Sequence, residues 1–422
     1  MDTEPASKTA ADIGKGTRRS QRYRPLLWLS FGHGVMHWHS ALIPLLYPVL
    51  ANQFALSFSQ LGFLTTARIL VGLVASTVGS PFTDAIRRKG PFLVMCLLWA
   101  ALMFLLLPLG RTYTYLGAVL SLMALGGVLW HPLAMPVVQR LYSGRSGFAL
   151  GIHGMVAAFA QGLGSLASGI ALSLVRWTRV ATIQGAVGVA AALLFLLFMP
   201  RRTGMAAHAD ATAVSLREMP GRLRRELVTR RLALISIVSS MKTGSEAGVL
   251  TFVPMLMSSQ FGLNLFWVGV GVGVLSVASS LAQPLVGRAA DRFGALATLC
   301  PGLAAGAIIL FCIPLVESPL ALLALLILLA LSLFSTTPVL FSWAMGSSSA
   351  DLGGSAVGFV FTMMAPGMVI PPLGGWLADR YGLASAFWLL GLVSLAGLAA
   401  TLLLIGDDTA IGGHKSRIGG AL

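Results

Sequence analysis

A few ionisable side chains fall inside long apolar stretches of this chain, where a charge is costly and therefore marks a candidate functional group. Lys242 and Glu246 are four residues apart, so they would share one face of a helix and could form an ion pair. Of the 14 acidic residues, Glu246 alone lies well inside an apolar stretch. A carboxylate whose pKa changes with its surroundings can couple proton binding to transport. We therefore assign Glu246 to proton coupling, with simple neutralisation of Lys242 as the alternative.

Histidines form a second candidate group, because imidazole gains and loses a proton near neutral pH. His33 and His37 are four residues apart in the first apolar stretch, and His131 lies in a later one. We assign His33 to proton coupling and assign His37 and His131 to a substrate site, whereas His39 and His153 are expected to be structural. Paired histidines can also bind a divalent metal. No carboxylate or thiol accompanies them in the sequence, and Arg68 and Lys242 would repel a cation. No metal site is therefore assigned, and metal transport stays an alternative.

Arg68 also lies in an apolar stretch, and no carboxylate is present one helical turn away along the chain. A guanidinium group in a medium of low dielectric constant needs an anion or a set of hydrogen-bond acceptors. One hypothesis is that Arg68 binds an anionic substrate, with Lys242 contributing a second positive charge. The alternative is a structural hydrogen bond from Arg68 to a carbonyl or hydroxyl group of a neighbouring helix.

The composition indicates what kind of protein must position these groups. Hydrophobic residues make up 56% of the 422-residue chain and charged residues 10%, with a mean hydropathy of +0.84. Soluble domains carry roughly 25% charged residues, so most of this chain is expected to lie in a lipid bilayer. The formal net charge of +15 does not indicate a nucleic-acid partner, because the basic residues lie at the ends of apolar stretches.

Twelve apolar stretches are long enough to cross a bilayer as helices of about 20 residues, and none shows the two-residue alternation of a membrane strand. They are approximately 26–51, 59–80, 91–109, 114–139, 148–174, 180–199, 232–259, 266–287, 295–315, 319–342, 354–377 and 383–405. The predicted fold is therefore an all-α integral membrane protein of two pseudo-symmetric six-helix bundles, 26–199 and 232–405. A basic cytosolic linker, 200–231, would join them, with a disordered basic tail at 1–25 and a second cytosolic tail at 406–422.

Lysine and arginine set the expected orientation, because the cytoplasmic loops of membrane proteins are enriched in both. With the N-terminus in the cytoplasm, most of the 29 Lys and Arg residues lie in cytoplasmic loops and tails. The opposite side would hold Arg111, Arg176, Arg179 and Arg380. Both termini are therefore expected in the cytoplasm.

A short polar motif occurs twice, at the same place in each predicted bundle. The clear copy includes Gly287, Asp291 and Arg292, and the divergent copy includes Asp84 and Arg88. With twelve predicted helices and a basic central segment, this duplicated motif resembles the major facilitator superfamily, in which it joins helices two and three and again eight and nine. The resemblance implies that Asp84 and Asp291 bond to a neighbouring helix and hold one conformation closed. All five residues therefore form the expected conformational gate.

A third, similar segment runs from Gly375 to Gly382 and contains Asp379 and Arg380. It lies between the last two predicted helices, on the side expected to face away from the cytoplasm. No gate function is assigned to this copy.

Finer features resemble the fosmidomycin-resistance branch of the same superfamily. They are His33, the segment 43–48, the segment 56–62 that opens the second predicted helix, His131-Pro132, and the segment 248–254. Where that branch usually continues from the first histidine with Asn-Asp, this chain has Val35-Met36-His37. The resemblance implies proton-driven efflux of small molecules across the bacterial inner (plasma) membrane.

These features predict a secondary active transporter that works by alternating access. We expect proton-coupled export of a small anionic, phosphonate-like compound or drug, with import of a small anionic metabolite or export of a metal or metal complex as alternatives. The chain lacks the Gly-x4-Gly-Lys-Ser/Thr loop that binds nucleotide phosphates and any known catalytic motif, so neither a cofactor nor enzyme activity is expected. The expected partners are the substrate, protons and the lipid bilayer, and the chain is expected to be a monomer.

Overall fold

The computed structural model describes residues 10–86, 88–142, 146–199, 230–337, 339–340 and 362–404. In these ranges the regular structure is helical, as the sequence predicts. Nine of the described helices are long and apolar enough to cross a bilayer. The other three predicted spans do not meet this criterion. The first is interrupted between α1 and α2, the one that coincides with α9 is more polar, and the one that includes η5 and α15 is described only in part. The all-α membrane fold class is confirmed.

The first bundle consists of α1 (Ala10–Ser40), α2 (Leu42–Phe54), α3 (Phe58–Ala85), α4 (Lys89–Leu106), the short 3-10 helix η1 (Leu107–Leu109), α5 (Tyr113–Leu141), α6 (Ser146–Leu174) and α7 (Trp177–Phe198). The first predicted span, 26–51, is divided at Ala41. Pro44 explains this break, because its ring nitrogen cannot donate a backbone hydrogen bond and its ring crowds the carbonyl group of Ser40.

The second bundle consists of α9 (Arg230–Ser259), α10 (Leu265–Phe293), α11 (Ala295–Cys312), η3 (Ile313–Leu315), α12 (Pro319–Ser332), η4 (Phe334–Thr336), η5 (Ala365–Val369), α15 (Ile370–Tyr381) and α16 (Leu383–Leu402). The predicted span 319–342 ends as an α-helix at Ser332 and continues as η4. The first part of the predicted span 354–377 lies outside the described residues.

The segments predicted to lie outside the two bundles are described only in part. α1 begins at Ala10, so a helix extends into the segment 1–25, which the sequence predicts to be disordered. Alanine, lysine and arginine in this segment favour a helix, whereas Gly14 and Gly16 do not. Nearly all of the predicted linker 200–231 and the whole of the tail 406–422 lie outside the described residues.

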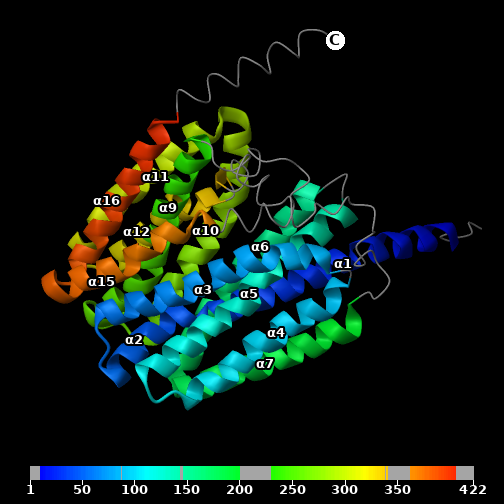
Figure 1. Ribbon diagram of the computed structural model, residues 1–422, viewed down its shortest axis with the longest axis horizontal. Helices are drawn as coiled ribbons and strands as arrows, with labels where there is room; N and C mark the ends of the chain where they lie inside the picture. The colour runs from blue at the N-terminus through cyan, green and yellow to red at the C-terminus, as the bar shows by residue number, and fades with distance from the viewer. Residues whose placement is uncertain are drawn as a thin grey trace, which may run out of the picture.

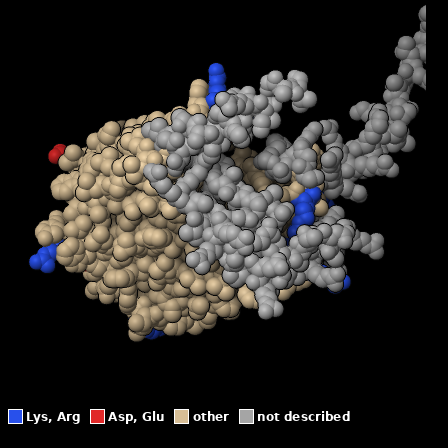
Figure 2. Space-filling view, turned by 45° about the horizontal axis from the view of Figure 1, so that its top comes forward, with Lys and Arg blue, Asp and Glu red and all other residues tan. Residues whose placement is uncertain are grey.

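Large apolar side chains cover much of the outer surface of both bundles. Exposed examples on α3, α7, α10, α12 and α16 are Val74, Leu197, Leu285, Leu328 and Leu392. Figure 2 shows a face whose described surface is almost free of charged groups, with most of the Lys and Arg side chains near its edges. A soluble protein rarely exposes so continuous an apolar surface, so these helices are suited to contact with lipid.

The two bundles lie side by side and meet along α6 with α10 and along α3 with α15 (Figure 1). Glycine allows these backbones to approach closely, because a Cβ atom on Gly269 of α10 would lie 2.8 Å from the Cα atom of Gly169 on α6. Likewise, a Cβ atom on Gly62 of α3 would clash with the carbonyl oxygen of Pro371 on α15. Contacts between small residues are a common way to pack helices within a membrane.

The molecule is closed where α3 begins and α15 ends, and we call this the Asp379 end. The Asp379 carboxylate accepts hydrogen bonds from the backbone N–H groups of Phe58 (2.7 Å) and Ser59 (2.9 Å) and from the Ser59 hydroxyl. It therefore joins the second bundle to the N-terminus of α3, where the helix dipole favours a negative charge. Asp379 belongs to the third motif copy, for which the sequence predicts no gate function.

The opposite end, where α3 ends at Ala85 and α10 ends at Phe293, is called the hinge end. The predicted gate residues lie here, namely Asp84, Arg88, Gly287, Asp291 and Arg292. Asp291 and Arg292 are exposed, and within the described part of the chain Asp291 makes no hydrogen bond or ion pair. The side chain of Asp84 lies outside the described residues. In this conformation Asp291 therefore does not make the closing contact that the resemblance implies.

Candidate functional site

A cavity of about 240 Å³ lies between the two bundles. Its wall comes mainly from the first bundle, and Thr243 of α9 and Met364, just before η5, contribute from the second. Most lining residues are apolar, and the polar ones are His37, His39, Ser40, Arg68, His131 and Thr243. A mostly apolar cavity with a few polar groups is typical of a site for small molecules.

Arg68 of α3 is one of the residues that line this cavity. Its Nε atom is buried and has no hydrogen-bond partner among the described residues. The described residues that line the cavity include no Asp or Glu. The hydroxyl group of Tyr47 is hydrogen-bonded to Thr65 Oγ1 at 2.8 Å. This geometry favours the anion hypothesis over a structural hydrogen bond.

Three histidines from two helices converge close to Arg68, and we call His33, His37 and His131 the histidine cluster. His33 and His37 come from α1 and His131 from α5, and one ring nitrogen of each lies within 4.8 Å of the others. The Nε2 atoms of His33 and His131 are 3.3 Å apart. His153 of α6 stacks on His33, with ring centroids 4.2 Å apart. The structure thus brings the predicted proton residue His33 next to two predicted substrate residues.

Each ring of the cluster has a hydrogen-bond partner at Nδ1. The partners are the carbonyl oxygen of His153 for His33 (3.2 Å), the carbonyl oxygen of Gly127 for His131 (3.1 Å) and Oε1 of Gln161 for His37 (2.8 Å). His39 is separate from the cluster, because its ring packs against Phe104 and its Nε2 lies 3.1 Å from the carbonyl oxygen of Gln184. His39 also lines the cavity, so its structural role stays a prediction.

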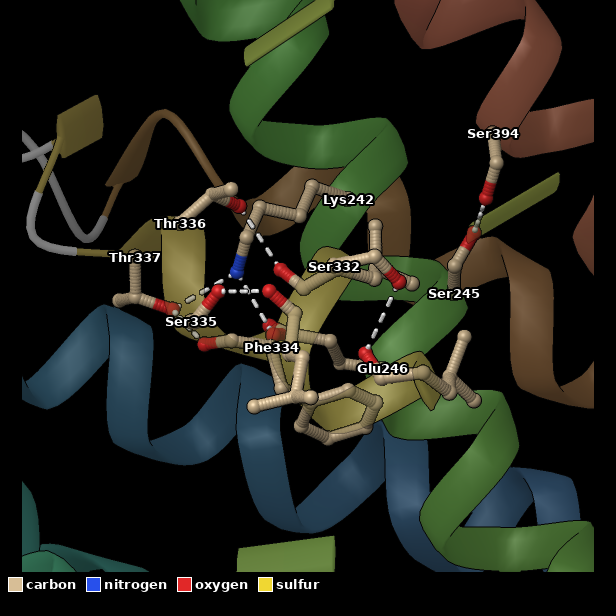
Figure 3. Close-up of polar contacts among 12 residues, drawn as sticks. Lys242, Ser245, Glu246, Ser332, Phe334, Ser335, Thr336, Thr337 and Ser394 are labelled. Atoms are coloured by element: carbon tan, nitrogen blue, oxygen red, sulfur yellow. Dashed lines mark hydrogen bonds and ion pairs between the residues drawn. The ribbon is translucent and has the colours of Figure 1, made fainter. Parts of the chain in front are cut away.

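Lys242 and Glu246 form the predicted ion pair on α9, with Lys242 Nζ 2.6 Å from Glu246 Oε1. Lys242 Nζ also donates a hydrogen bond to Thr337 Oγ1 at 2.7 Å, and Figure 3 shows the ammonium group directed toward the segment that follows α12. Lys242 is buried, Glu246 is half-buried, and neither lines the cavity, although Thr243 between them does. Lys242 therefore has partners of its own, unlike Arg68.

Reasoning from ionisable residues missed one member of the site. Gln161 orients His37, but its side chain is uncharged and therefore does not stand out among ionisable residues. A polar amide inside an apolar stretch is a visible signal, and it could have placed α6 beside α1.

Comparison with known proteins gives the family. A family model described as Major Facilitator Superfamily matches residues 29–372 of this chain. The chain belongs to the major facilitator superfamily. Members of this family are membrane-embedded transporters of small molecules, so the protein is a secondary transporter in a lipid bilayer rather than an enzyme.

Individual relatives are distant but cover most of the chain. The chain is 24% identical over 386 residues to the uncharacterized MFS-type transporter YfnC of Bacillus subtilis (strain 168), covering 90% of this chain and 93% of the relative. It is 26% identical over 319 residues to the multidrug resistance protein MdtG of Citrobacter koseri, covering 74% of this chain and 77% of the relative.

Solved structures agree with the fold. A bacterial homologue of the human lysosomal transporter Spinster matches with a TM-score of 0.74 at 15% identity, covering 90% of this chain and 95% of that chain. A mutant of the nucleoside transporter NupG matches with a TM-score of 0.70 at 10% identity, covering 90% and 99%. At these identities the likeness concerns the fold alone.

Proposed function

We propose that this transporter exports a small anionic compound by alternating access, driven by protons. The observation that carries the proposal is the Arg68 guanidinium, which borders a cavity between the bundles and has no carboxylate beside it. A cation in such a site is best balanced by an anion that enters from outside the protein. A compound of phosphonate type, with a compact anionic group and a small body, suits both the charge and the mostly apolar wall.

His37 and His131 line the same cavity, and either ring can contact the charged end of a bound compound once its second nitrogen carries a proton or a cation. We therefore keep both residues as proposed substrate contacts together with Arg68. The role proposed from the sequence for Lys242 changes, because its ammonium group is already bonded to Glu246 and Thr337 and does not border the cavity. Lys242 acts in this proposal as the partner of the proton-coupling carboxylate.

Proton coupling is assigned to Glu246, with His33 as a second proton site. When Glu246 is ionised it neutralises Lys242 at 2.6 Å. When Glu246 is protonated, the neutral Thr337 is the one other hydrogen-bond partner of Lys242 among the described residues. A buried ammonium group without its counter-ion is costly, so protonation of Glu246 would favour a conformation in which Lys242 reaches water or another acceptor. Proton binding would therefore change the relative stability of two conformations, and proton-coupled transport requires such a change.

Export is favoured by the likeness to relatives named multidrug resistance proteins and by the resemblance to the fosmidomycin-resistance branch. The proposal places the protein in the bacterial inner membrane as a monomer with both termini in the cytoplasm, as the distribution of Lys and Arg predicts. With that orientation the Asp379 end faces away from the cytoplasm, and its closure leaves the cavity to be loaded from the cytoplasm.

Expression in an efflux-deficient bacterial host tests the proposal. We expect the wild-type protein to protect cells against phosphonate antimicrobials and Arg68→Ala to lose this protection at equal membrane abundance. Arg111→Ala is the matched control, because Arg111 is an exposed arginine away from the cavity. Protection that survives in Arg68→Ala would contradict the anion site, and sensitisation of cells by the wild-type protein would indicate import instead.

A further inference from the structure

The hydrogen bonds of the histidine cluster fix where each ring carries its proton. A neutral imidazole has one N–H donor and one nitrogen that can only accept. The Nδ1 atoms of His33 and His131 face backbone carbonyl oxygens at 3.2 Å and 3.1 Å, and such oxygens can only accept. Both rings must therefore carry the proton on Nδ1. His37 follows the same pattern, because its Nδ1 lies 2.8 Å from Gln161 Oε1.

This assignment leaves accepting nitrogens facing one another. The Nε2 atoms of His33 and His131 are 3.3 Å apart, within hydrogen-bond distance, yet neither neutral ring has a proton to place between them. Two lone pairs directed at each other in a membrane interior repel. The arrangement becomes favourable when a positively charged species, either a proton or a metal ion, lies between the nitrogens.

The spacing of the nitrogens suits a metal ion. Zinc–nitrogen bonds of about 2.05 Å in a tetrahedral site place two nitrogen ligands roughly 3.4 Å apart. His33 Nε2 and His131 Nε2 already have nearly this separation, and the His37 nitrogen lies within 4.8 Å of both. Histidines that ligate metals usually donate their other N–H group to a carbonyl or similar acceptor, which is the pattern found here.

The surroundings indicate the class of metal and what completes its coordination. Imidazole ligands favour zinc, copper, nickel and related divalent ions over magnesium and calcium, which prefer oxygen. Three histidines leave one tetrahedral position open, and two of the three line the cavity. Arg68 lines it too and would repel an unaccompanied cation, whereas an anion in the open position would bind both the metal and the guanidinium.

We propose that His33, His37 and His131 form a binding site for a divalent transition metal of the zinc class, with an anionic group of the substrate as the fourth ligand. The sequence predicts no metal here, because no carboxylate or thiol accompanies the histidines along the chain and because Arg68 and Lys242 would repel a cation. The three rings from α1 and α5 supply enough ligands without one. The assignment of the substrate's anionic group as the fourth ligand rests on the proposed function, whereas the metal site itself does not depend on transport.

Metal binding can be measured on the purified full-length protein in lipid nanodiscs after removal of any histidine tag and treatment with a chelator. We expect one equivalent of Co²⁺ to give the visible absorption of a tetrahedral nitrogen site and Zn²⁺ to displace it. His33→Gln and His131→Gln should each weaken Zn²⁺ binding at least tenfold. His39→Gln is the matched control, because His39 is also a buried histidine of α1 but bonds to Gln184 outside the cluster.

The outcomes separate the alternatives. Absence of Zn²⁺ binding by the wild-type protein would overturn the metal site and leave a shared proton as the occupant. Equal Zn²⁺ affinity in wild type and His131→Gln would place the metal elsewhere and also overturn it. Methylphosphonate should change the Co²⁺ spectrum of the wild-type protein but not of Arg68→Ala. If Co²⁺ binds but methylphosphonate does not change its spectrum, the substrate anion is not the fourth ligand. The proposed export function is tested independently by the protection of cells.

Discussion

At the scale of residues, the two positive charges inside the membrane have opposite surroundings. Lys242 is bonded to Glu246 and Thr337 and does not reach the cavity. Arg68 borders the cavity and has no acidic partner among its described neighbours. One charge is therefore balanced within the protein, and the other is available for a substrate. This difference is the basis of the proposed division between a proton-coupling pair in the second bundle and a substrate site in the first.

Replacing Glu246 by Gln removes the charge while keeping the size of the side chain. Lys242 would lose its counter-ion, and removing one partner of a buried pair costs about 3 kcal/mol or more, so we expect a lower melting temperature. We also expect pH-gradient-driven accumulation of substrate to be abolished while exchange of substrate at equal pH continues. Both can be measured with the purified and reconstituted protein.

The double variant Lys242→Met with Glu246→Gln is the control for this prediction. It removes both charges, so the melting temperature should recover toward that of the wild type while gradient-driven transport stays lost. Full gradient-driven transport by Glu246→Gln would show that the pair is structural only.

At the scale of elements, the helices meet where the sequence permits close backbone contact, and the Asp379 side chain adds hydrogen bonds between the bundles at one end. Gly269 against Gly169 brings α10 to α6, and Gly62 brings α3 to the Pro371 backbone. The Asp379 carboxylate accepts hydrogen bonds from the first backbone N–H groups of α3. The third motif copy therefore supplies the closing contact seen in this conformation, while Asp291 of the clear copy is exposed at the hinge end.

The Asp379 contact makes a prediction about pH and conformation. Partial burial raises the pKa of Asp379, but hydrogen bonds from the Ser59 side chain and from the Ser59 and Phe58 backbone lower it more, so the net pKa is below the usual value. The stabilisation is therefore fully present above the ordinary Asp pKa of about 3.9 and is lost as pH falls through the lowered value. The closed Asp379 end should not respond to pH between about 5 and 8 through this residue.

Asp379→Asn should mimic the protonated state at neutral pH. We expect the population that is open at the Asp379 end to rise a few-fold, a modest effect because the contact is exposed. Spin labels on cysteines introduced at Arg111 and Leu315, exposed positions in different bundles, would report the separation between the bundles. Asp291→Asn is the control and should leave this distance distribution unchanged, and an unchanged distribution in Asp379→Asn would exclude the closing role.

At the scale of the whole molecule, apolar runs of sufficient length predict the helices well, because a bilayer demands helices that satisfy their own backbone hydrogen bonds. The four-residue spacing also predicts the Lys242–Glu246 pair, because both residues lie on one helix. The break at Ala41 follows from Pro44, a signal present in the sequence but not used to divide the span.

The sequence does not predict which residues of different helices meet. His131 and Gln161 come from α5 and α6, far from His33 and His37 in the chain, and no local spacing shows that they meet. For the same reason the contact between Asp379 and the start of α3 could not be foreseen, although the third motif copy was visible. Periodicity along one helix is a local property, whereas a site between helices depends on how they pack.

The central claim, proton-driven export of an anion through the Arg68 cavity, is tested most directly by transport into inverted membrane vesicles. Their cytoplasmic face is outward, so export appears as uptake of a labelled phosphonate. We predict accumulation when the vesicle interior is acidic, loss of accumulation when the pH gradient is collapsed, and no accumulation with Arg68→Ala. Equal accumulation with and without the gradient, or in wild type and Arg68→Ala alike, would contradict this account.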